Sequence, residues 1–201
     1  MLDLFLRELK EKILAVFVPL FVKVHPNTLT TVSLFFGILC NVAVLQGQYF
    51  VAHILWLLNR FFDGIDGVVA RKTGRASNFG GYYDILSDFA IYCSLPIAIA
   101  VQQQGPQLAL SCMLLEALYC LNAVGLFYLS ALLEKVNLER KRAELTSVTF
   151  PAALVEGFET MVAYSAFLLW PAWCSTLFFV FGGGVAISIV QRLRWAFYHL
   201  P

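Results

Sequence analysis

The stretch VHPNTLTTVSLFFGILCNVAVLQGQYFVAHILWLLN, residues 24–59, contains no Asp, Glu, Lys or Arg. Residues 89–115 and 160–191 are equally free of these four residue types. An α-helix needs about 20 apolar residues to cross the hydrocarbon core of a bilayer. Uncharged runs of this length predict an all-α integral membrane protein that crosses the membrane several times.

The composition of the whole chain agrees with this prediction. Of the 201 residues, 60% are hydrophobic and 13% are charged, whereas an ordinary soluble domain has roughly 25% charged residues. With 14 Lys and Arg against 13 Asp and Glu, there is no basic excess to suggest nucleic acid as a partner. Little sequence is left for a second, soluble domain, so we expect one membrane domain over residues 1–201.

Turn signals divide the apolar sequence into six predicted spans, which form a bundle over residues 28–191. The N-terminal residues 1–25 predict an amphipathic helix on the membrane surface, because apolar residues recur on one helix face. An ordinary amphipathic helix packed on protein is the alternative. The spans are expected at residues 28–46, 50–70, 80–101, 107–133, 148–169 and 172–191.

The basic residues are unevenly distributed among the connections between these spans. The connections at 46–49, 102–107 and 170–173 carry no charge, and the other connections and the two termini hold nearly every Lys and Arg. Cytoplasmic loops are enriched in Lys and Arg. This pattern predicts an even number of spans with both termini on the cytoplasmic side.

Four aspartates form two spaced pairs at the cytoplasmic ends of spans two and three. Asp63 and Asp66 are three residues apart, and Asp84 and Asp88 are four apart, so each pair shares one helix face. The short connection at 71–79 brings both pairs to the same membrane face. Charged groups within a span are costly and normally line a functional cavity.

Four converging carboxylates repel one another unless cations neutralise them. Oxygen ligands without His or Cys suit Mg²⁺ or Mn²⁺, and two such ions are expected. Gly67 and Ala70 leave one strip of span two without bulk, Gly80 does the same in span three, and Arg71 adds a positive charge. These features favour a substrate that carries phosphate groups.

Three other interpretations are open at this point. The aspartates could cap helices and pair with Arg60, Arg71 and Arg75. The cluster could belong to a transporter, although transporter sites usually lie near the membrane midplane. A catalytically inactive membrane scaffold is the third alternative.

Further charged residues are weaker candidates for binding an acceptor. Glu156 and Glu159 share a helix face in span five, where they could orient a polar acceptor or form an ion pair with Arg60. Arg140 could hold an acceptor phosphate or contact anionic lipid. Glu116 is expected to be structural.

The string Asp63-Gly64-Ile65-Asp66-Gly67-Val68-Val69-Ala70-Arg71, followed by Gly80, Asp84 and Asp88, resembles the signature of class I CDP-alcohol phosphotransferases, also called CDP-alcohol phosphatidyltransferases. Pro26-Asn27-Thr28-Leu29-Thr30 resembles that superfamily's entry to span one. The segments Leu58-Asn59-Arg60 and Glu156-Gly157-Phe158-Glu159-Thr160 are similar to an uncharacterised bacterial inner-membrane branch of it.

This resemblance implies transfer of a phosphatidyl or other phosphoalcohol group from a CDP-linked lipid to an alcohol hydroxyl, with release of CMP. It implies that Asp63, Asp66 and Asp84 are metal ligands and that Asp88 is the general base and also contacts a second metal. Nucleotide and diphosphate contacts are implied for Asn27, Thr30, Gly67, Ala70, Arg71 and Gly80. The expected partners are a CDP-lipid donor, a polar alcohol and membrane lipids, and a homodimer is left open. The identity of the acceptor, among glycerol 3-phosphate, inositol phosphate, serine and other alcohols, is also left open.

Overall fold

The computed structural model describes residues 13–141 and 153–200, with the backbone alone for residues 136–141. Within these ranges the regular structure is helical throughout and contains no strand. The elements are α2 (Val18–Phe21), α3 (Pro26–Leu45), α4 (Tyr49–Lys72), α5 (Asn78–Gln103), α6 (Pro106–Lys141), α7 (Gly157–Leu169), the 3₁₀ helix η1 (Pro171–Trp173) and α8 (Cys174–His199).

Four segments of the described chain are long and apolar enough to cross a membrane: Pro26–Leu45, Asn78–Gln103, Pro106–Lys135 and Pro171–His199. Helix α4 has 24 residues, but Arg60, Asp63 and Asp66 lie within it, so its composition alone does not mark it as a span. Helix α7 is apolar but has 13 residues, a length of about 20 Å, against a hydrocarbon core of about 30 Å.

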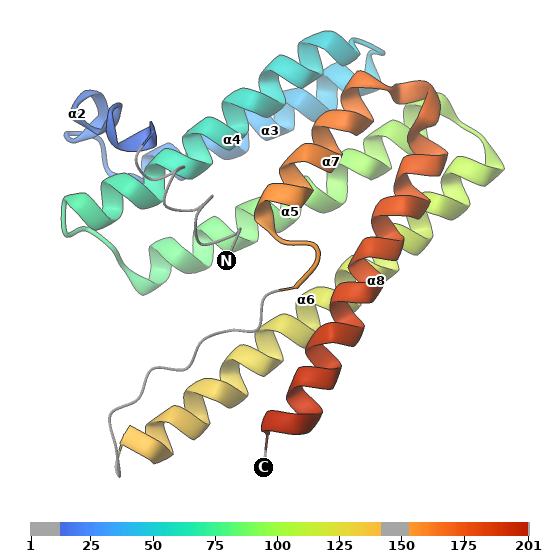
Figure 1. Cartoon of the computed structure of the whole chain (residues 1–201). Helices are drawn as coiled ribbons and strands as arrows, with labels where there is room; N and C mark the ends of the chain where they lie inside the picture. Colours follow the sequence, from blue (N-terminus) through green and yellow to red (C-terminus); the bar gives the residue numbers. More distant parts are fainter. Residues whose placement is uncertain (1–12, 142–152, 201) are drawn as a thin grey trace.

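The helices form two groups that diverge at one end (Figure 1). Helix α3 packs against both α4 and α5, and α6 packs chiefly against α8. Helix α7 packs against α4 and α8 and so joins the two groups. The start of α3, the end of α4 and the start of α5 therefore lie together, because α4 and α5 are joined by the short connection at 73–77.

Two clusters of buried apolar side chains hold these helices together. The larger cluster lies between α3, α4, α5, α6, α7 and α8 and includes the fully buried Trp56, Tyr164, Phe167 and Phe178. The smaller cluster contains Leu29 of α3 and Ile65, Val68 and Val69 of α4, together with Leu14 and Val18. The smaller cluster supports the end of α4 on which Asp66 lies.

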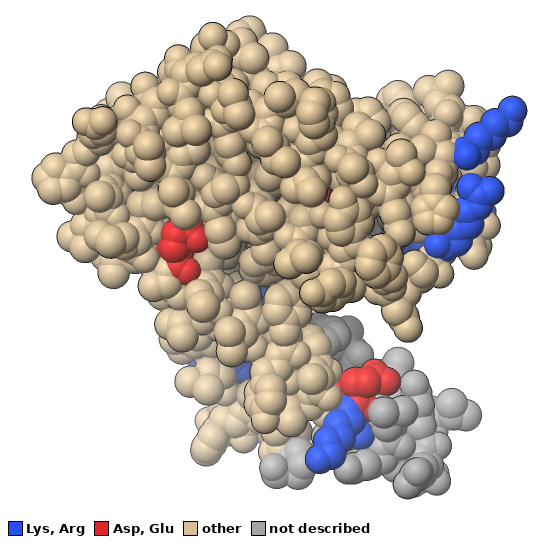
Figure 2. Space-filling view, turned by 180° about the vertical axis from the view of Figure 1, so that it is seen from behind, with Lys and Arg blue, Asp and Glu red and all other residues tan. Residues whose placement is uncertain are grey.

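The outer surface is predominantly apolar. Figure 2 shows Lys and Arg side chains at one edge and at the lower end of the molecule, with a broad surface between them that is almost free of charged side chains. Phe35, Val101, Met113 and Val180 are among the exposed large hydrophobic residues. A surface of this kind suits lipid rather than water.

Helix boundaries differ from the predicted spans most clearly in the fifth span, for which a helix over 148–169 was wrong. Residues 153–156 are not helical, and α7 begins at Gly157. The reason is local, since Glu156 caps the helix with its own side chain. Residues 148–152 lie outside the described residues.

The N-terminal helix predicted over residues 1–25 can be compared only from residue 13 onward, because residues 1–12 lie outside the described residues. Residues 13–25 do not form one continuous helix. Pro19 is the second residue of the short helix α2 and Pro26 is the first residue of α3, and proline has no backbone N–H to continue a preceding helix. Val16 and Leu20 are each 74% exposed.

Candidate active site

A cavity of about 200 Å³ lies where the start of α3, the end of α4 and the start of α5 meet. All six residues expected to contact the nucleotide and diphosphate line it, together with two of the four aspartates. The lining residues are Pro26, Asn27, Thr30, Asp66, Gly67, Ala70, Arg71, Arg75, Ala76, Ser77, Gly80, Gly81 and Asp84. The tertiary structure thus brings the separated motif residues to one cavity.

Two helix N-termini border this cavity. Helix α3 begins at Pro26 after the cap residue His25, whose Nδ1 accepts a hydrogen bond from the backbone N–H of Asn27 at 3.3 Å. Helix α5 begins after Ser77, whose Oγ accepts from the backbone N–H of Gly80 at 3.0 Å. Helix N-termini attract anions, and the Arg71 and Arg75 side chains add positive charge. This end of the cavity suits a phosphate or diphosphate group.

Two glycines make room in the cavity wall. A Cβ atom on Gly67 would lie 3.2 Å from Nη1 of Arg71, so the Arg71 guanidinium lies directly over the Gly67 backbone. A Cβ atom on Gly80 would lie 3.0 Å from Oδ1 of Asn27 and 3.1 Å from Oγ of Ser77. Larger side chains at either position would displace residues that line the cavity.

Of the four aspartates, Asp66 and Asp84 line the cavity. Asp66 is buried and accepts a hydrogen bond from the Thr30 hydroxyl across the α3–α4 contact. Asp84, which belongs to α5, lines the same cavity. The pocket therefore has a carboxylate on each of two helices.

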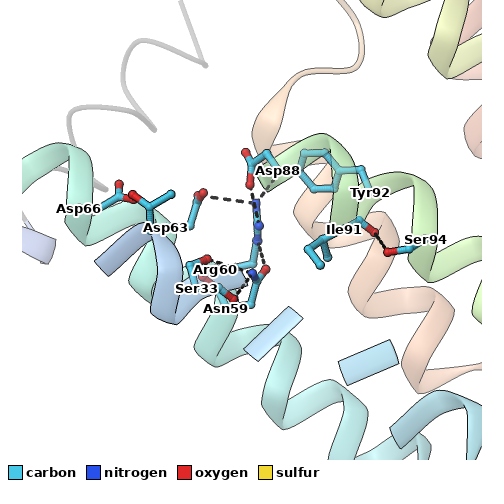
Figure 3. A network of polar contacts seen from close by, with 10 residues as sticks. Ser33, Asn59, Arg60, Asp63, Asp66, Asp88, Ile91, Tyr92 and Ser94 are labelled. Carbon is cyan, nitrogen blue, oxygen red and sulfur yellow. Dashed lines mark hydrogen bonds and ion pairs between the residues drawn. The ribbon is translucent and has the colours of Figure 1, made fainter. Parts of the chain in front are cut away.

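The other two aspartates contact Arg60, which lies between them in Figure 3. Nη2 of Arg60 donates to Oδ1 of Asp88 at 2.8 Å, and Nη1 lies 3.5 Å from Oδ2 of Asp63. The Arg60 side chain is 7% exposed. Its Nε donates to Oδ1 of Asn59 at 2.7 Å, and its Nη1 donates to the Tyr92 hydroxyl.

The four carboxylates are close enough to interact electrostatically, but no three of them are close enough together to hold one metal ion. Asp63 interacts electrostatically with both Asp88 and Asp84. Across residues 13–141 and 153–200, however, no three His, Cys, Asp or Glu side chains converge closely enough to hold a metal. Asp63 and Asp88 therefore form the ion pairs with Arg60 that one of the alternatives from the sequence included.

The acidic residues of α7 lie elsewhere than the sequence predicts. Glu156 is the N-cap of α7 and Glu159 is in its first turn, so they are not a few turns inside a span. Oε1 of Glu156 accepts from the Ala153 N–H at 2.8 Å, and Oε2 of Glu159 accepts from the Glu156 N–H at 3.1 Å. Their predicted ion pair with Arg60 is not formed, because Arg60 faces Asp63 and Asp88 instead.

The other two charged residues considered from the sequence, Arg140 and Glu116, both lie on α6. Arg140 lies in the last turns of α6, but its side chain lies outside the described residues. Glu116 lies beside Cys93 of α5, at a helix contact distant from the cavity lining. Roles in binding the acceptor for Arg140, Glu156 and Glu159 stay predictions.

Several residues at or near the cavity were not assigned a role in substrate binding or catalysis by the sequence. Arg75 and Ser77 line the cavity, and Tyr92 and Asn59 position Arg60. The cap residue Ser77 had a detectable signal, because serine is a favoured N-cap and lies three residues before the predicted start of span three. Tyr92 had none beyond its position four residues after Asp88.

The comparison with known proteins identifies the class to which this fold and site belong. Residues 23–190 match the CDP-alcohol phosphatidyltransferase family. The chain belongs to this family.

Similarity to individual proteins follows the same pattern. The chain is 28% identical over 175 residues to inner membrane protein YnjF of Escherichia coli strain K12, covering 87% of this chain and 84% of that protein. It is 29% identical to phosphatidylinositol phosphate synthase of Corynebacterium glutamicum over 70% of this chain and 60% of that enzyme. It is also 35% identical to CDP-diacylglycerol–serine O-phosphatidyltransferase of Helicobacter pylori strain 26695, over 37% of this chain and 32% of that enzyme.

Membership of the family and the named relatives define the chain as a transferase of phospholipid biosynthesis in a membrane. The family uses CDP-lipid donors and alcohol acceptors, and it is generally dependent on divalent metal. The long apolar helices and the similarity to an inner membrane protein agree that the chain is an integral membrane protein.

Proposed function

We propose that this protein transfers a phosphatidyl group from a CDP-linked lipid, such as CDP-diacylglycerol, to the hydroxyl of a polar alcohol and releases CMP. The observation that carries the proposal is the set of residues that line the cavity. Asn27, Thr30, Gly67, Ala70, Arg71 and Gly80 come from three helices and line it together with two carboxylates.

The donor set of this cavity fits a hard divalent cation. Asp66 and Asp84 offer carboxylate oxygens from two helices, and no cysteine or histidine lines the cavity among the described residues. Mg²⁺ and Mn²⁺ prefer such oxygen ligands and share them with substrate phosphates. The chemistry that a bound ion supplies here is neutralisation of diphosphate charge while the bond to CMP breaks.

The residues of the chain account for the remaining requirements of the reaction. The N-termini of α3 and α5, with Arg71 and Arg75, bind the diphosphate of the donor. The acceptor hydroxyl oxygen forms a bond to the lipid-side phosphorus, and the phosphorus–oxygen bond to CMP breaks. Asp88 accepts the hydroxyl proton, and its side chain is 26% exposed, so an acceptor can reach it.

The position of the cavity along the helices supports entry of a lipid donor. Asp66 lies six residues before the end of α4 and Asp84 six residues after the start of α5, about 9 Å of helix in each case. Such a site lies near the headgroup level of a bilayer. A transporter site near the midplane fits this position less well.

For the membrane arrangement we propose six spans within one domain, with α4 and α7 crossing in addition to the four long apolar helices. Arg71 and Lys72 in the last turn of α4, together with Arg75 in the α4–α5 connection, support a cytoplasmic position for the active site and both termini. The extended apolar surface of α4 outside its carboxylate face is consistent with this proposal, since Leu57, Ile54 and Phe50 are exposed.

The decisive experiment measures CMP release from CDP-diacylglycerol by the purified protein with each candidate alcohol in turn. We expect release only with a divalent metal: it should cease in excess chelator and return on addition of Mg²⁺ or Mn²⁺. Undiminished release in chelator would remove the metal from the proposal. Absence of CMP release with every alcohol and metal would favour a transporter or an inactive scaffold.

A further inference from the structure

The Arg60 side chain is held by contacts on several sides. Besides its contacts to Asp63 and Asp88, its guanidinium carbon lies 4.7 Å from the ring centre of Trp56 and 5.0 Å from that of Tyr92. Trp56 is fully buried and stacks on Tyr164. Because aromatic rings and hydrogen bonds hold the guanidinium on several sides, it cannot swing out to solvent without breaking the core contacts.

The position of Arg60 divides the four carboxylates into two pairs. Asp63 and Asp88 share the guanidinium, whereas Asp66 and Asp84 line the cavity. A divalent ion bridging Asp63 and Asp88 would lie next to a buried positive charge, and like charges at such separations repel strongly in a partly buried site. Two of the four negative charges are thus already compensated in part by the chain itself.

We propose that Arg60 is a positioning residue that acts as a built-in cation for Asp63 and Asp88, so that the protein binds one divalent ion instead of two. The ion is held on the cavity side by Asp66 and Asp84. This inference rests on the proposed transferase function, since it concerns the same site and the same metal.

A fixed guanidinium also has a consequence for the orientation of Asp88. Its hydrogen bond to Oδ1 joins α4 to α5 and holds the carboxylate in one place before any acceptor arrives. Lysine has the same charge but lacks the planar arrangement of donors that lets arginine contact Asp63, Asp88, Asn59 and Tyr92 together. Lysine at position 60 should therefore keep the positive charge but no longer fix the orientation of the Asp88 carboxylate.

The test counts bound metal ions directly in the absence of substrate. Mn²⁺ is titrated into the purified full-length protein in lipid nanodiscs, and free Mn²⁺ is followed by electron paramagnetic resonance. We expect one tightly bound ion per wild-type chain. Arg60→Gln should gain a second ion, because Asp63 and Asp88 then lack a counter-charge, whereas Arg60→Lys and the exposed-arginine control Arg194→Gln should stay at one.

A matched pair of substitutions on one helix keeps the test informative if Arg60→Gln does not fold. Asp66→Asn should weaken Mn²⁺ binding by about tenfold or more, because Asp66 is a ligand and the charge of the ligands sets the affinity. Asp63→Asn should change Mn²⁺ binding by less than about threefold, because Asp63 contacts Arg60 and is not a ligand of the ion. Arg60→Lys should lower kcat for CMP release more than it changes KM for the donor.

The outcomes separate this inference from the function on which it rests. Two ions per wild-type chain, or equal loss of Mn²⁺ binding in Asp63→Asn and Asp66→Asn, would overturn the role of Arg60 while leaving metal-dependent CMP release intact. A wild-type chain that binds no Mn²⁺ and releases no CMP would overturn the proposed function itself.

Discussion

The Thr30 hydroxyl of α3 donates a hydrogen bond to Oδ2 of Asp66 of α4, and both side chains are buried. This contact joins the Pro-Asn-x-x-Thr segment at the start of α3 to the first pair of aspartates. It also holds the Asp66 carboxylate at the wall of the cavity that Thr30 helps to line. The two motifs are therefore parts of one site.

Replacing Thr30 tests the importance of this hydrogen bond. Thr30→Val keeps the shape of the side chain but leaves the buried Asp66 without its hydroxyl partner, a loss of about 1–3 kcal/mol. We expect a lower melting temperature and weaker Mn²⁺ binding in thermal-shift titrations. Thr30→Ser restores the hydroxyl and should behave almost as wild type; equal defects in both variants would argue that the methyl group matters instead.

Asp88→Asn and Asp66→Asn should have different kinetic signatures. Asparagine at position 88 keeps size and hydrogen bonding but cannot accept the acceptor's proton, so kcat for CMP release should fall by roughly 10² to 10⁴. Binding of the CDP-lipid should survive in Asp88→Asn but weaken together with metal binding in Asp66→Asn. Steady-state kinetics and calorimetry measure these effects. Near-normal turnover of Asp88→Asn would disprove its role as general base.

Gly67→Leu should exclude the nucleotide. A Cβ atom at this position already lies 3.2 Å from the Arg71 guanidinium, so the leucine side chain displaces Arg71 or fills the cavity. We expect CMP binding to be lost in calorimetric titrations, although leucine is a better helix former than glycine by roughly 0.8–1 kcal/mol.

The matched control for Gly67→Leu is Gly183→Leu in α8, where a Cβ atom would meet no atom within 4 Å. It makes the same substitution in a helix outside the cavity lining, and CMP binding should be unchanged. Normal CMP binding by Gly67→Leu would show that the glycine serves helix packing alone.

Cysteine labelling tests the sidedness of the proposed six-span arrangement. Lys72 at the end of α4 and Gln107 at the start of α6 are both exposed, and they lie at opposite ends of α5. In a variant with the exposed native Cys120 replaced by serine, Lys72→Cys and Gln107→Cys should react with a membrane-impermeant thiol reagent from opposite faces of oriented vesicles. Reaction of both from one face would contradict the proposed topology.

The spacing of the motif residues made much of the cavity predictable. In helices, residues three and four apart share a face. The spacing in the sequence therefore predicted that Asp63 lies near Asp66 and that Asp84 lies near Asp88. The short connection after α4 then required the second pair to lie at the same end of the bundle. For Glu156 and Glu159 the same spacing was misleading, because the start of the helix could not be located to within one turn.

What the sequence by itself determined is the apolar, all-helical character of the chain and the motif residues of the site, most of which line the cavity. The first follows from the length of the uncharged runs, and the second follows from the spacing of the aspartates together with the resemblance of the motif to a known family signature. Only the tertiary structure decided how the four carboxylates are divided, with Asp66 facing Thr30 and the cavity, and Asp63 and Asp88 facing Arg60. The physical reason is that Arg60 and Trp56 lie on α4 and Tyr92 lies on α5, and the packing of both helices against α3 brings these side chains together although Tyr92 is distant from the other two in the sequence.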